Sequence, residues 1–414
     1  RAGVEVIEET EDVVPERSEP PLPRDFAPPR IPPFVLVLFA WTALAHVTVG
    51  LAAFAGARAA RIPCPALIAI GIAVVAALPF RGRMLSLMPD RRRPAWRVAL
   101  VDLPYFAHWC AATLASCAMI GAVIAWLVLR VVRGPAPFDL IDAAAWTYLA
   151  GALLSAWGVW IRRRWVRTRS VEIGIRGLPK VWDAYRIVQL SDLHLGSFDT
   201  ARSGLRWARQ AVELRPDLIA VTGDLLTSGE DFFEDVAEVM AALRAPDGAL
   251  FVPGNHDYFG APGELFRLVA HRGVRVLRNE SVRVERAGTT LVIAGVDDTW
   301  TRHADLERAL SGREGAAATV LLAHDPDLFP LAARASVDLV LSGHTHGGQV
   351  AVPFLARWLN ISRRAHSFHL GLYERGRSKL YVSAGLGVTG PPIRIGAAPE
   401  VTVITLRSIA PEAP

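Results

Sequence analysis

Five short segments of the sequence carry residue types that commonly bind metal ions, and each segment follows a short aliphatic or β-branched run. They are Asp192-Leu193-His194, Thr222-Gly223-Asp224, Gly254-Asn255-His256-Asp257, Ala323-His324-Asp325 and Gly343-His344-Thr345-His346. The donors are imidazole, carboxylate and amide oxygen without any thiolate, a set that suits Mn, Fe, Zn or Mg. They are too many for one ion and about right for two ions that share a carboxylate. Two such ions would suit an in-line displacement at phosphorus.

Each segment alone has a simpler explanation. A Gly-Asp pair after a strand is usually a turn, in which glycine supplies the backbone freedom and the carboxylate bonds the main chain. A single histidine after an apolar strand is usually a hydrogen-bonded loop or core residue. The conjunction argues for a site, because five of the eleven histidines of the chain fall within these five segments.

The elements that position these residues are predicted to be strands of an α/β sheet domain. From Val171 onward, β-branched runs alternate with amphipathic stretches, a pattern typical of that class. The runs 186–190, 218–221, 249–252, 319–322 and 339–341 immediately precede the five segments. Ligands of α/β sheets bind beyond the carboxyl ends of the strands, so we expect the segments to converge in one crevice.

This series of motifs resembles the calcineurin-like metallophosphoesterase superfamily over about residues 170–406. The continuation Gly347-Gly348-Gln349 and the closing stretch from Leu380 to Val403 look like the bacterial membrane-attached branch, which includes phosphodiesterases related to lipid A precursor pyrophosphatases. The resemblance implies a four-layer αββα sandwich over 170–408. One departure is Ala384, which stands where related chains often have a basic residue, and this puts one substrate contact in doubt.

The resemblance also implies which residues would hold two divalent metal ions, either Mn, Fe, Zn or Mg. One ion would be held by Asp192, His194 and His346. The other would be held by Asn255, His324 and His344. Asp224 would bridge the two ions, and a hydroxide between them would be the nucleophile.

Two further residues receive catalytic roles from the same resemblance. His256 would contact the phosphate and donate a proton to the leaving oxygen. Asp257 would fix the tautomer of His256 by bonding its other ring nitrogen. Arg394 has two interpretations, because it either neutralises a phosphate oxygen or is a solvated or packing residue. Asp297 and Asp298 are expected to be turn residues.

The residues before this domain predict a membrane region of four helices within 34–165. The apolar runs are about 34–57, 63–80, 104–129 and 141–161. A span needs roughly 20 residues, so three runs are long enough and the second is marginal. Residues 1–33 are acidic and proline-rich, which predicts a disordered tail.

Arginines predict the orientation of these runs. Eleven arginines lie in the loop 81–97 and in the segment 162–169, against four in the two opposite loops. The positive-inside rule therefore places the catalytic domain in the cytoplasm, on a multi-pass protein of the inner (plasma) membrane. Within the runs, His46, His108 and Asp142 either mark a transport path or, as we prefer, lie near an interface or bond a neighbouring helix.

Charge disfavours a nucleic-acid partner. The whole chain carries a net charge of +5, but residues 171–414 contain 26 Lys and Arg against 28 Asp and Glu, so the basic excess belongs to the membrane region. We therefore predict a membrane-anchored hydrolase of a phosphodiester or pyrophosphate, with a phospholipid or nucleotide-lipid as a candidate substrate. The alternatives are a catalytically silent binding or regulatory membrane protein, and a nuclease or cyclic nucleotide phosphodiesterase.

The segment 353–364 follows the last metal motif and leaves two interpretations open. It mixes Phe354, Leu355, Trp358 and Ile361 with three arginines and has no acid. Such a segment either docks on the bilayer and guides a lipid phosphate to the metals, or caps the sheet edge.

Overall fold

The computed structural model describes residues 33–86, 88–135, 137–351, 360, 362–363 and 366–410. All but the last residue of the predicted tail, and most of the segment 353–364, lie outside the described residues. Of that segment, Asn360 is buried and its side-chain amide donates to the Gly347 carbonyl at 3.0 Å.

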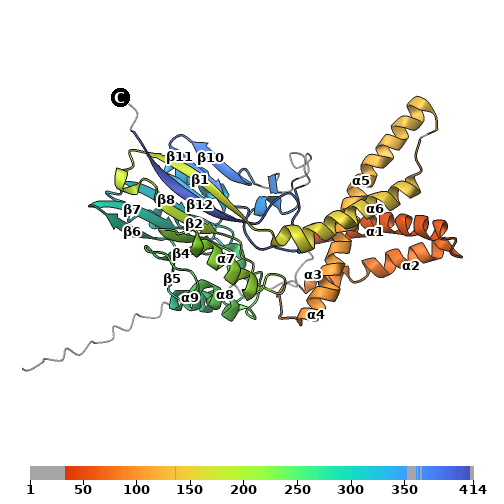
Figure 1. The fold of residues 1–414 in the computed structure, drawn as a ribbon, viewed down its shortest axis with the longest axis horizontal. Coiled ribbons are helices and arrows are strands. Elements are labelled where there is room, and N and C mark those ends of the chain that lie inside the picture. Colours follow the sequence, from red (N-terminus) through yellow and green to blue (C-terminus); the bar gives the residue numbers. More distant parts are fainter. Residues whose placement is uncertain are drawn as a thin grey trace, which may run out of the picture. The chain divides into compact units, whose positions relative to one another are not determined.

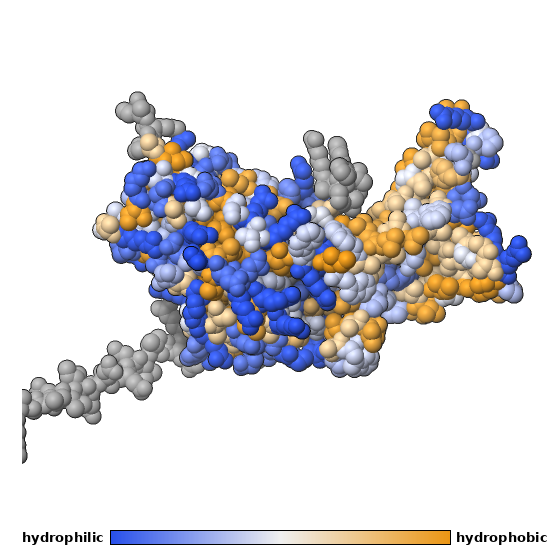
Figure 2. All heavy atoms as spheres, in the orientation of Figure 1, coloured by the Kyte–Doolittle hydropathy of each residue, from blue (hydrophilic) through white to orange (hydrophobic). Residues whose placement is uncertain are grey.

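Among the described residues of the N-terminal half, four helices are long and apolar enough to cross a membrane. They run over Leu36–Ala59, Pro65–Leu85, Ala95–Arg133 and Leu140–Arg164. Their surfaces carry many exposed hydrophobic side chains, as Figure 2 shows, in contrast to the mainly hydrophilic sheet domain. The constituent elements are α1 (Pro33–Ala59), α2 (Pro65–Ala77), α3 (Phe80–Leu85), α4 (Ala95–Arg97), η1 (Val98–Asp102), α5 (Leu103–Arg133), α6 (Leu140–Ala156), η2 (Trp157–Ile161) and η3 (Arg162–Arg164).

The second of these helices is longer than the sequence indicated. Leu78 and Pro79 keep right-handed helical dihedrals between α2 and α3, so the helix continues past residue 80 instead of ending there. The third helix begins earlier than expected, at Ala95.

The polar residues inside the helical region bond to neighbouring helices. The Nδ1 atom of His108 lies 2.7 Å from the Tyr148 hydroxyl, and its Nε2 atom lies 3.3 Å from Nε2 of His46. Asp142 forms an ion pair with Arg58 at 2.9 Å. The preferred interpretation of these residues, as partners of neighbouring helices, therefore agrees with the contacts.

The C-terminal half contains two six-stranded sheets (Figure 1). The first has the order β1 (Arg167–Arg176), β12 (Glu400–Ile409), β2 (Arg186–Leu190), β3 (Leu218–Thr222), β4 (Ala249–Val252) and β5 (Val274–Val276). The second has the order β10 (Gly371–Arg375), β11 (Ser378–Val382), β9 (Leu339–Ser342), β8 (Ala318–Leu322), β7 (Thr289–Gly295) and β6 (Glu280–Arg286).

Three hydrophobic cores separate four layers. The first core joins one face of the first sheet to α7 (Ala201–Glu213), α8 (Phe233–Ala241) and α9 (Pro262–His271). The second lies between the two sheets and includes Ile187 and Leu218 from one and Val320 and Leu341 from the other. The third joins the second sheet to α10 (Leu306–Ala309) and α11 (Phe329–Arg334). The domain is therefore the αββα sandwich that the resemblance implied.

Residue patterns explain these layers. The central strands β2, β3, β4, β8 and β9 are aliphatic and almost wholly buried, as expected of strands covered on both faces. In α7, Gly204, Trp207, Ala208 and Ala211 are buried at helical spacing, which gives the helix one apolar face.

One buried polar side chain joins the two sheets at the ends of their strands. Gln189 of β2 donates to the Thr222 hydroxyl in the first sheet and to the Ser342 carbonyl in the second, both at 2.9 Å. Thr222 is the last residue of β3 and Ser342 is the last residue of β9. These two hydrogen bonds therefore hold the carboxyl ends of the two strands, which precede predicted ligands, at a fixed position relative to each other.

Candidate metal centre

The carboxyl ends of five strands bring the predicted ligands together. Asp192 and His194 follow β2, Asp224 follows β3, and Asn255 begins the short helix η5 (Asn255–Tyr258) after β4. In the second sheet, the two strands β8 and β9 precede His324, His344 and His346.

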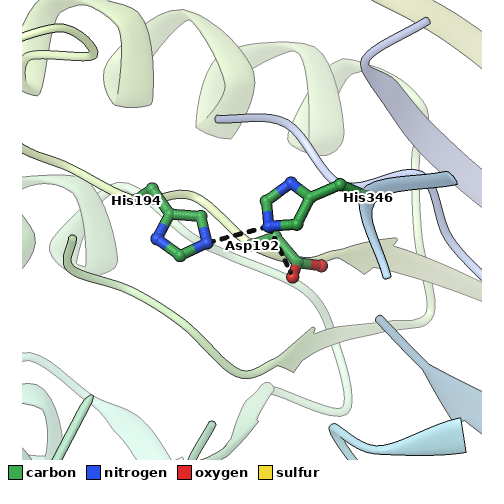
Figure 3. Close-up of side chains that lie close together, drawn as sticks. All are labelled: Asp192, His194 and His346. Atoms are coloured by element: carbon green, nitrogen blue, oxygen red, sulfur yellow. Dashed lines mark hydrogen bonds and ion pairs between the residues drawn. The ribbon is translucent and has the colours of Figure 1, made fainter. Parts of the chain in front are cut away.

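The first group of donors consists of Asp192, His194 and His346, whose ligand atoms all lie within 4.8 Å of one another (Figure 3). The Nε2 atoms of His194 and His346 are 3.0 Å apart, and Nε2 of His346 is 3.5 Å from Oδ1 of Asp192. All three side chains are buried. Two imidazole nitrogens and a carboxylate oxygen therefore point at one small volume.

The second group consists of Asp224, His324 and His344. Nε2 of His324 is 3.2 Å from Oδ2 of Asp224 and 3.1 Å from Nδ1 of His344. The same Oδ2 atom is 3.4 Å from Nε2 of His194, so the Asp224 carboxylate contacts both groups. This is the position that a shared ligand requires.

Backbone carbonyls fix which ring nitrogen faces the centre. Nδ1 of His194 lies 3.2 Å from the Leu226 carbonyl, and Nδ1 of His324 lies 2.8 Å from the Thr222 carbonyl. A carbonyl can only accept, so Nδ1 carries a proton in each ring and Nε2 is the atom that faces the Asp224 carboxylate. Each Nε2 atom can therefore meet either a proton or a metal ion at that carboxylate.

An unpartnered oxygen supports the fit of the donors to metal ions. The side-chain Oδ1 atom of Asn255 is buried and has no hydrogen-bond partner among the described residues. A buried polar atom without a partner is costly unless something binds it. An amide oxygen is an ordinary ligand for Mn, Fe, Zn or Mg, and the residue that follows Asn255 donates its backbone N–H to Oδ1 of Asp224 at 3.0 Å.

The charges of the buried groups agree with this interpretation. Burial lowers the pKa of His194 to about 3 and that of His346 well below its usual range, so both rings stay neutral. Burial alone would also lower the pKa of His324, but the Asp224 carboxylate reverses this and raises it to about 10. The Asp224 carboxylate therefore favours positive charge at Nε2 of His324, which lies 3.2 Å from it.

The backbone is strained where these ligands sit. Asp192, His194, Asp224, His344 and His346 all have φ between 43° and 69°, in the left-handed region that non-glycine residues seldom adopt. Such conformations cost on the order of 1–3 kcal/mol each and cluster at functional sites. Five strained positions among seven predicted ligands indicate that the strand ends are shaped for their side chains.

Two glycines of the motifs allow close approach. A Cβ atom on Gly254 would lie 2.2 Å from Oδ1 of Asp224, and one on Gly343 would lie 1.9 Å from Oγ of Ser191 and 2.3 Å from Oδ2 of Asp192. Any larger residue at either position would displace a ligand carboxylate.

The expected contact between Asp257 and the ring of His256 is absent. Nδ1 of His256 lies 2.6 Å from the Thr227 carbonyl instead. The buried carboxylate of Asp257 accepts the backbone N–H groups of Asp224, Leu225 and Gly254 at 2.8–2.9 Å. The prediction for Asp257 is therefore corrected: it holds the Asp224 loop, and Thr227 orients His256.

Arg394 is a packing residue and does not face solvent. Its side chain is fully buried and donates to the carbonyls of Ala384 and Gly387, at 2.8 Å and 2.6 Å. Its guanidinium also lies 3.3 Å from Nδ1 of His346. It supports the loop behind a predicted ligand, so the interpretation as a phosphate contact is not favoured.

Several residues near the centre were not singled out by sequence reasoning. The ring centroid of His366 lies 5.1 Å from that of His344, and His366 forms a further group with Asp325 and Asp327. The exposed Trp300 lies beside His344, at 5.4 Å between centroids. The only available signal was that Asp325 follows His324 directly. Asp297 and Asp298 serve as turn and packing residues, since Asp297 accepts from Tyr258 and Asp298 accepts from the Thr301 backbone.

Comparisons with known proteins agree with this geometry. The family model of the calcineurin-like phosphoesterases matches residues 185–348, which include all seven predicted ligands. An uncharacterized metallophosphoesterase, YkuE of Bacillus subtilis, is 33% identical over 269 residues, which cover 63% of this chain and 94% of that protein.

Two vertebrate relatives contain membrane segments, as their names state. The transmembrane protein with metallophosphoesterase domain of Bos taurus is 34% identical over 256 residues, covering 58% of this chain and 56% of the relative. The protein of the same name from Danio rerio is 35% identical over 272 residues, covering 62% and 61%. The match thus spans little more than half of either vertebrate protein. Because the match with YkuE extends over nearly the whole Bacillus protein and the family model includes every predicted ligand, the chain belongs to the calcineurin-like phosphoesterase family.

Proposed function

We propose that this chain is a membrane-anchored hydrolase that cleaves a phosphodiester or pyrophosphate with two divalent metal ions. The observation that carries the proposal is the Asp224 carboxylate, whose Oδ2 atom lies 3.4 Å and 3.2 Å from the Nε2 atoms of two histidines in different donor groups. The unpartnered Oδ1 atom of Asn255 supports it independently.

We propose that the ligands hold ions at two positions, and the donor groups support this division. One ion would be held by Asp192, His194 and His346. The second would be held by Asn255, His324 and His344. Asp224 would contact both. When bound, two such ions lower the pKa of water and stabilise negative charge on a phosphate.

The residues of the chain orient the reaction. Because the Thr227 carbonyl holds Nδ1 of His256 at 2.6 Å, Nε2 is the atom that can deliver a proton to a leaving oxygen. The ring of His256 packs edge-on between His194 and Phe259, with centroids 4.7 Å and 4.9 Å away. Asp257 keeps the Asp224 loop in place through its three backbone hydrogen bonds.

The test of the proposal is metal reconstitution of the full chain in detergent. Protein stripped by chelation should bind two ions per chain when Mn, Fe, Zn or Mg is restored. The loaded protein should hydrolyse bis(p-nitrophenyl) phosphate faster than p-nitrophenyl phosphate. A single ion at saturation would contradict the two-ion site. Two bound ions without turnover of any diester or pyrophosphate would favour the silent binding protein instead.

The substrate class is proposed to be lipid-linked, because the sheet domain follows directly on four membrane-crossing candidates. A nuclease remains the alternative within the same chemistry, and the net negative charge of residues 171–414 disfavours it. A screen of phospholipids, nucleotide-lipids, cyclic nucleotides and DNA with the loaded protein separates these classes. Faster hydrolysis of DNA than of any lipid would favour the nuclease.

We also propose that the sheet domain is cytoplasmic, on the inner membrane. Eleven arginines flank the helices on its side against four on the other. A reporter enzyme that is active only in the cytoplasm should be active when fused after Arg407, and one that is active only in the periplasm should be inactive there. Periplasmic activity of that fusion would reverse the orientation.

A further inference from the structure

A cavity of about 690 Å³ lies outside the metal centre, between the helical region and the sheet domain. None of the predicted metal ligands lines it. Its polar wall is made by six arginines and contains one carboxylate, that of Asp199. The arginines are Arg92, Arg93, Arg163, Arg164, Arg202 and Arg206.

The cavity lies where two candidate membrane spans end. Arg163 and Arg164 are the last residues of the span Leu140–Arg164, and Ala95, Val98, Ala99 and Leu103 of its wall belong to the first turns of the span Ala95–Arg133. Phe198 and Phe232 of the sheet domain complete the apolar part of the wall. A molecule in this cavity would meet charge on one side and the start of the apolar span on the other.

Buried contacts build the walls. The Asp90 carboxylate accepts the Ser197 backbone N–H at 2.8 Å and the Arg93 guanidinium at 3.0 Å. Arg93 also bonds the fully buried Asp102 at 3.0 Å, and Arg163 pairs with Asp199 at 3.4 Å. The loop 90–93 and the end of the last span are thereby fixed to the loop that follows His194.

Half of the arginines are left without an acidic partner. Arg92, Arg93 and Arg163 form ion pairs with carboxylates at 2.7–3.4 Å. Among the described residues, no carboxylate forms an ion pair with Arg164, Arg202 or Arg206, and Arg206 donates only to the Ser203 hydroxyl, at 3.3 Å. Asp199 is the single carboxylate of the wall in the described part of the chain and is already paired with Arg163, so the six arginines leave an excess of positive charge that favours an anionic ligand.

The first turn of α7 adds to this attraction. This 13-residue helix begins beside Thr200, whose side chain gives no capping bond, and Thr200 and Ser203 both line the cavity. The free backbone N–H groups of a helix start favour phosphate oxygens. A guanidinium group can donate two parallel hydrogen bonds to the oxygens of one phosphate, which is a bidentate contact.

We propose that this cavity binds the phosphate headgroup of an anionic phospholipid of the surrounding bilayer, with its acyl chains along the helix that begins at Ala95. A bilayer lipid fits better than a free phosphate because the wall facing the span is apolar and the cavity lies at the span ends. The site requires neither metal binding nor hydrolysis. It is therefore independent of the proposed reaction.

The test is lipid binding by the full chain in detergent, measured by native mass spectrometry with dioleoyl phosphatidylglycerol. The variant Arg202→Gln with Arg206→Gln should weaken binding by on the order of 20-fold, since each surface arginine contributes roughly 5-fold toward an anionic lipid. The pair Arg202→Lys and Arg206→Lys keeps the charge but loses the bidentate contacts, so its binding should lie between that of the wild type and that of the glutamine pair. The matched control is Arg209→Gln with Arg267→Gln, which removes two exposed arginines of α7 and α9 outside the cavity.

Three outcomes would overturn the proposal. One is equal loss in the control pair. Another is equal binding of dioleoyl phosphatidylcholine, which carries phosphate without net charge. The last is binding of glycerol 3-phosphate as tight as that of the lipid, which would identify a soluble phosphate ligand. Should the double variant not fold, Arg164→Gln alone, with Arg267→Gln as its control, repeats the comparison at roughly 5-fold.

Discussion

Both halves of the molecule bury histidines in contact with one another, yet their hydrogen bonds differ. In the helices, His46 donates from Nδ1 to the Thr42 carbonyl at 2.7 Å, which leaves its Nε2 as an acceptor for His108. His108 then accepts from the Tyr148 hydroxyl. With both rings neutral, every donor in this row of hydrogen bonds, from Tyr148 through His108 and His46 to Thr42, has an acceptor.

In the sheet domain, the hydrogen-bond donors and acceptors of neutral histidine rings do not match in this way. His194 and His324 donate from Nδ1 to backbone carbonyls, and their Nε2 atoms both face the Asp224 carboxylate. Neutral rings would leave these atoms without a donor, so a proton or a metal ion must lie among them, in agreement with the pKa of His324, which Asp224 raises to about 10. The difference teaches that a buried histidine cluster indicates function when its lone pairs lack donors, and structure when they do not.

The largest effect is expected at the shared carboxylate. Asp224→Ala should remove both ions, and activity should fall by more than the roughly 10–100-fold typical of supporting residues. His324→Ala should leave one ion mostly bound. Metal analysis of the two variants beside the wild type provides the measurement, and one retained ion in Asp224→Ala would contradict a shared ligand.

The proton donor gives the next effect. His256→Gln should lower the turnover of diesters with poor leaving groups by roughly 10²–10⁴-fold. Turnover with p-nitrophenol as leaving group should change far less, because that group needs no proton. Steady-state rates on the two substrates measure the difference. Equal losses on both would assign His256 to substrate or metal binding.

A smaller effect on metal binding is expected from a substitution at Gly254, which removes no polar side-chain atom. Gly254→Ala places a methyl group against Oδ1 of Asp224, so the carboxylate must shift. We expect metal affinity to fall by roughly 10–100-fold, as for other residues that position ligands. Metal titration measures this, and Gly263→Ala, where nothing lies within 4 Å and φ is likewise not positive, controls for the exchange of glycine for alanine alone. Equal metal affinity in Gly254→Ala and the wild type would mean that the carboxylate tolerates the methyl group.

The smallest effect is expected in the helices. His108→Leu leaves the Tyr148 hydroxyl and Nε2 of His46 without partners, which should lower stability by about 0.5–2 kcal/mol. Thermal unfolding in detergent measures the change. Metal content should stay at the wild-type value. A loss of metal would contradict the view that the histidines of the helices are structural and only those of the sheet domain bind metal.

The sequence allowed the sheet class and the donor residues to be predicted because both follow from local patterns. Aliphatic runs that end in His, Asp and Asn reveal strand ends without knowledge of the partners. The roles of Asp257 and Arg394 were not predictable in this way. Asp257 is adjacent to His256 in the chain, but its carboxylate turns to the backbone of a different loop. The burial of Arg394 depends on Ala384 and Gly387, which the fold brings to it.

The pairing of β1 with β12 has a consequence for synthesis of the chain. The strand that leaves the membrane region, β1, pairs in parallel with the final strand along ten positions, from Arg167–Glu400 to Arg176–Ile409. At ribosomal rates β1 waits roughly 10–45 s for this partner. The first sheet can be completed only after almost the whole chain has been made, long after the synthesis of the four candidate membrane spans. Premature termination before Glu400 would leave β1 and β2 with unpaired edges beside the membrane, exposed to aggregation.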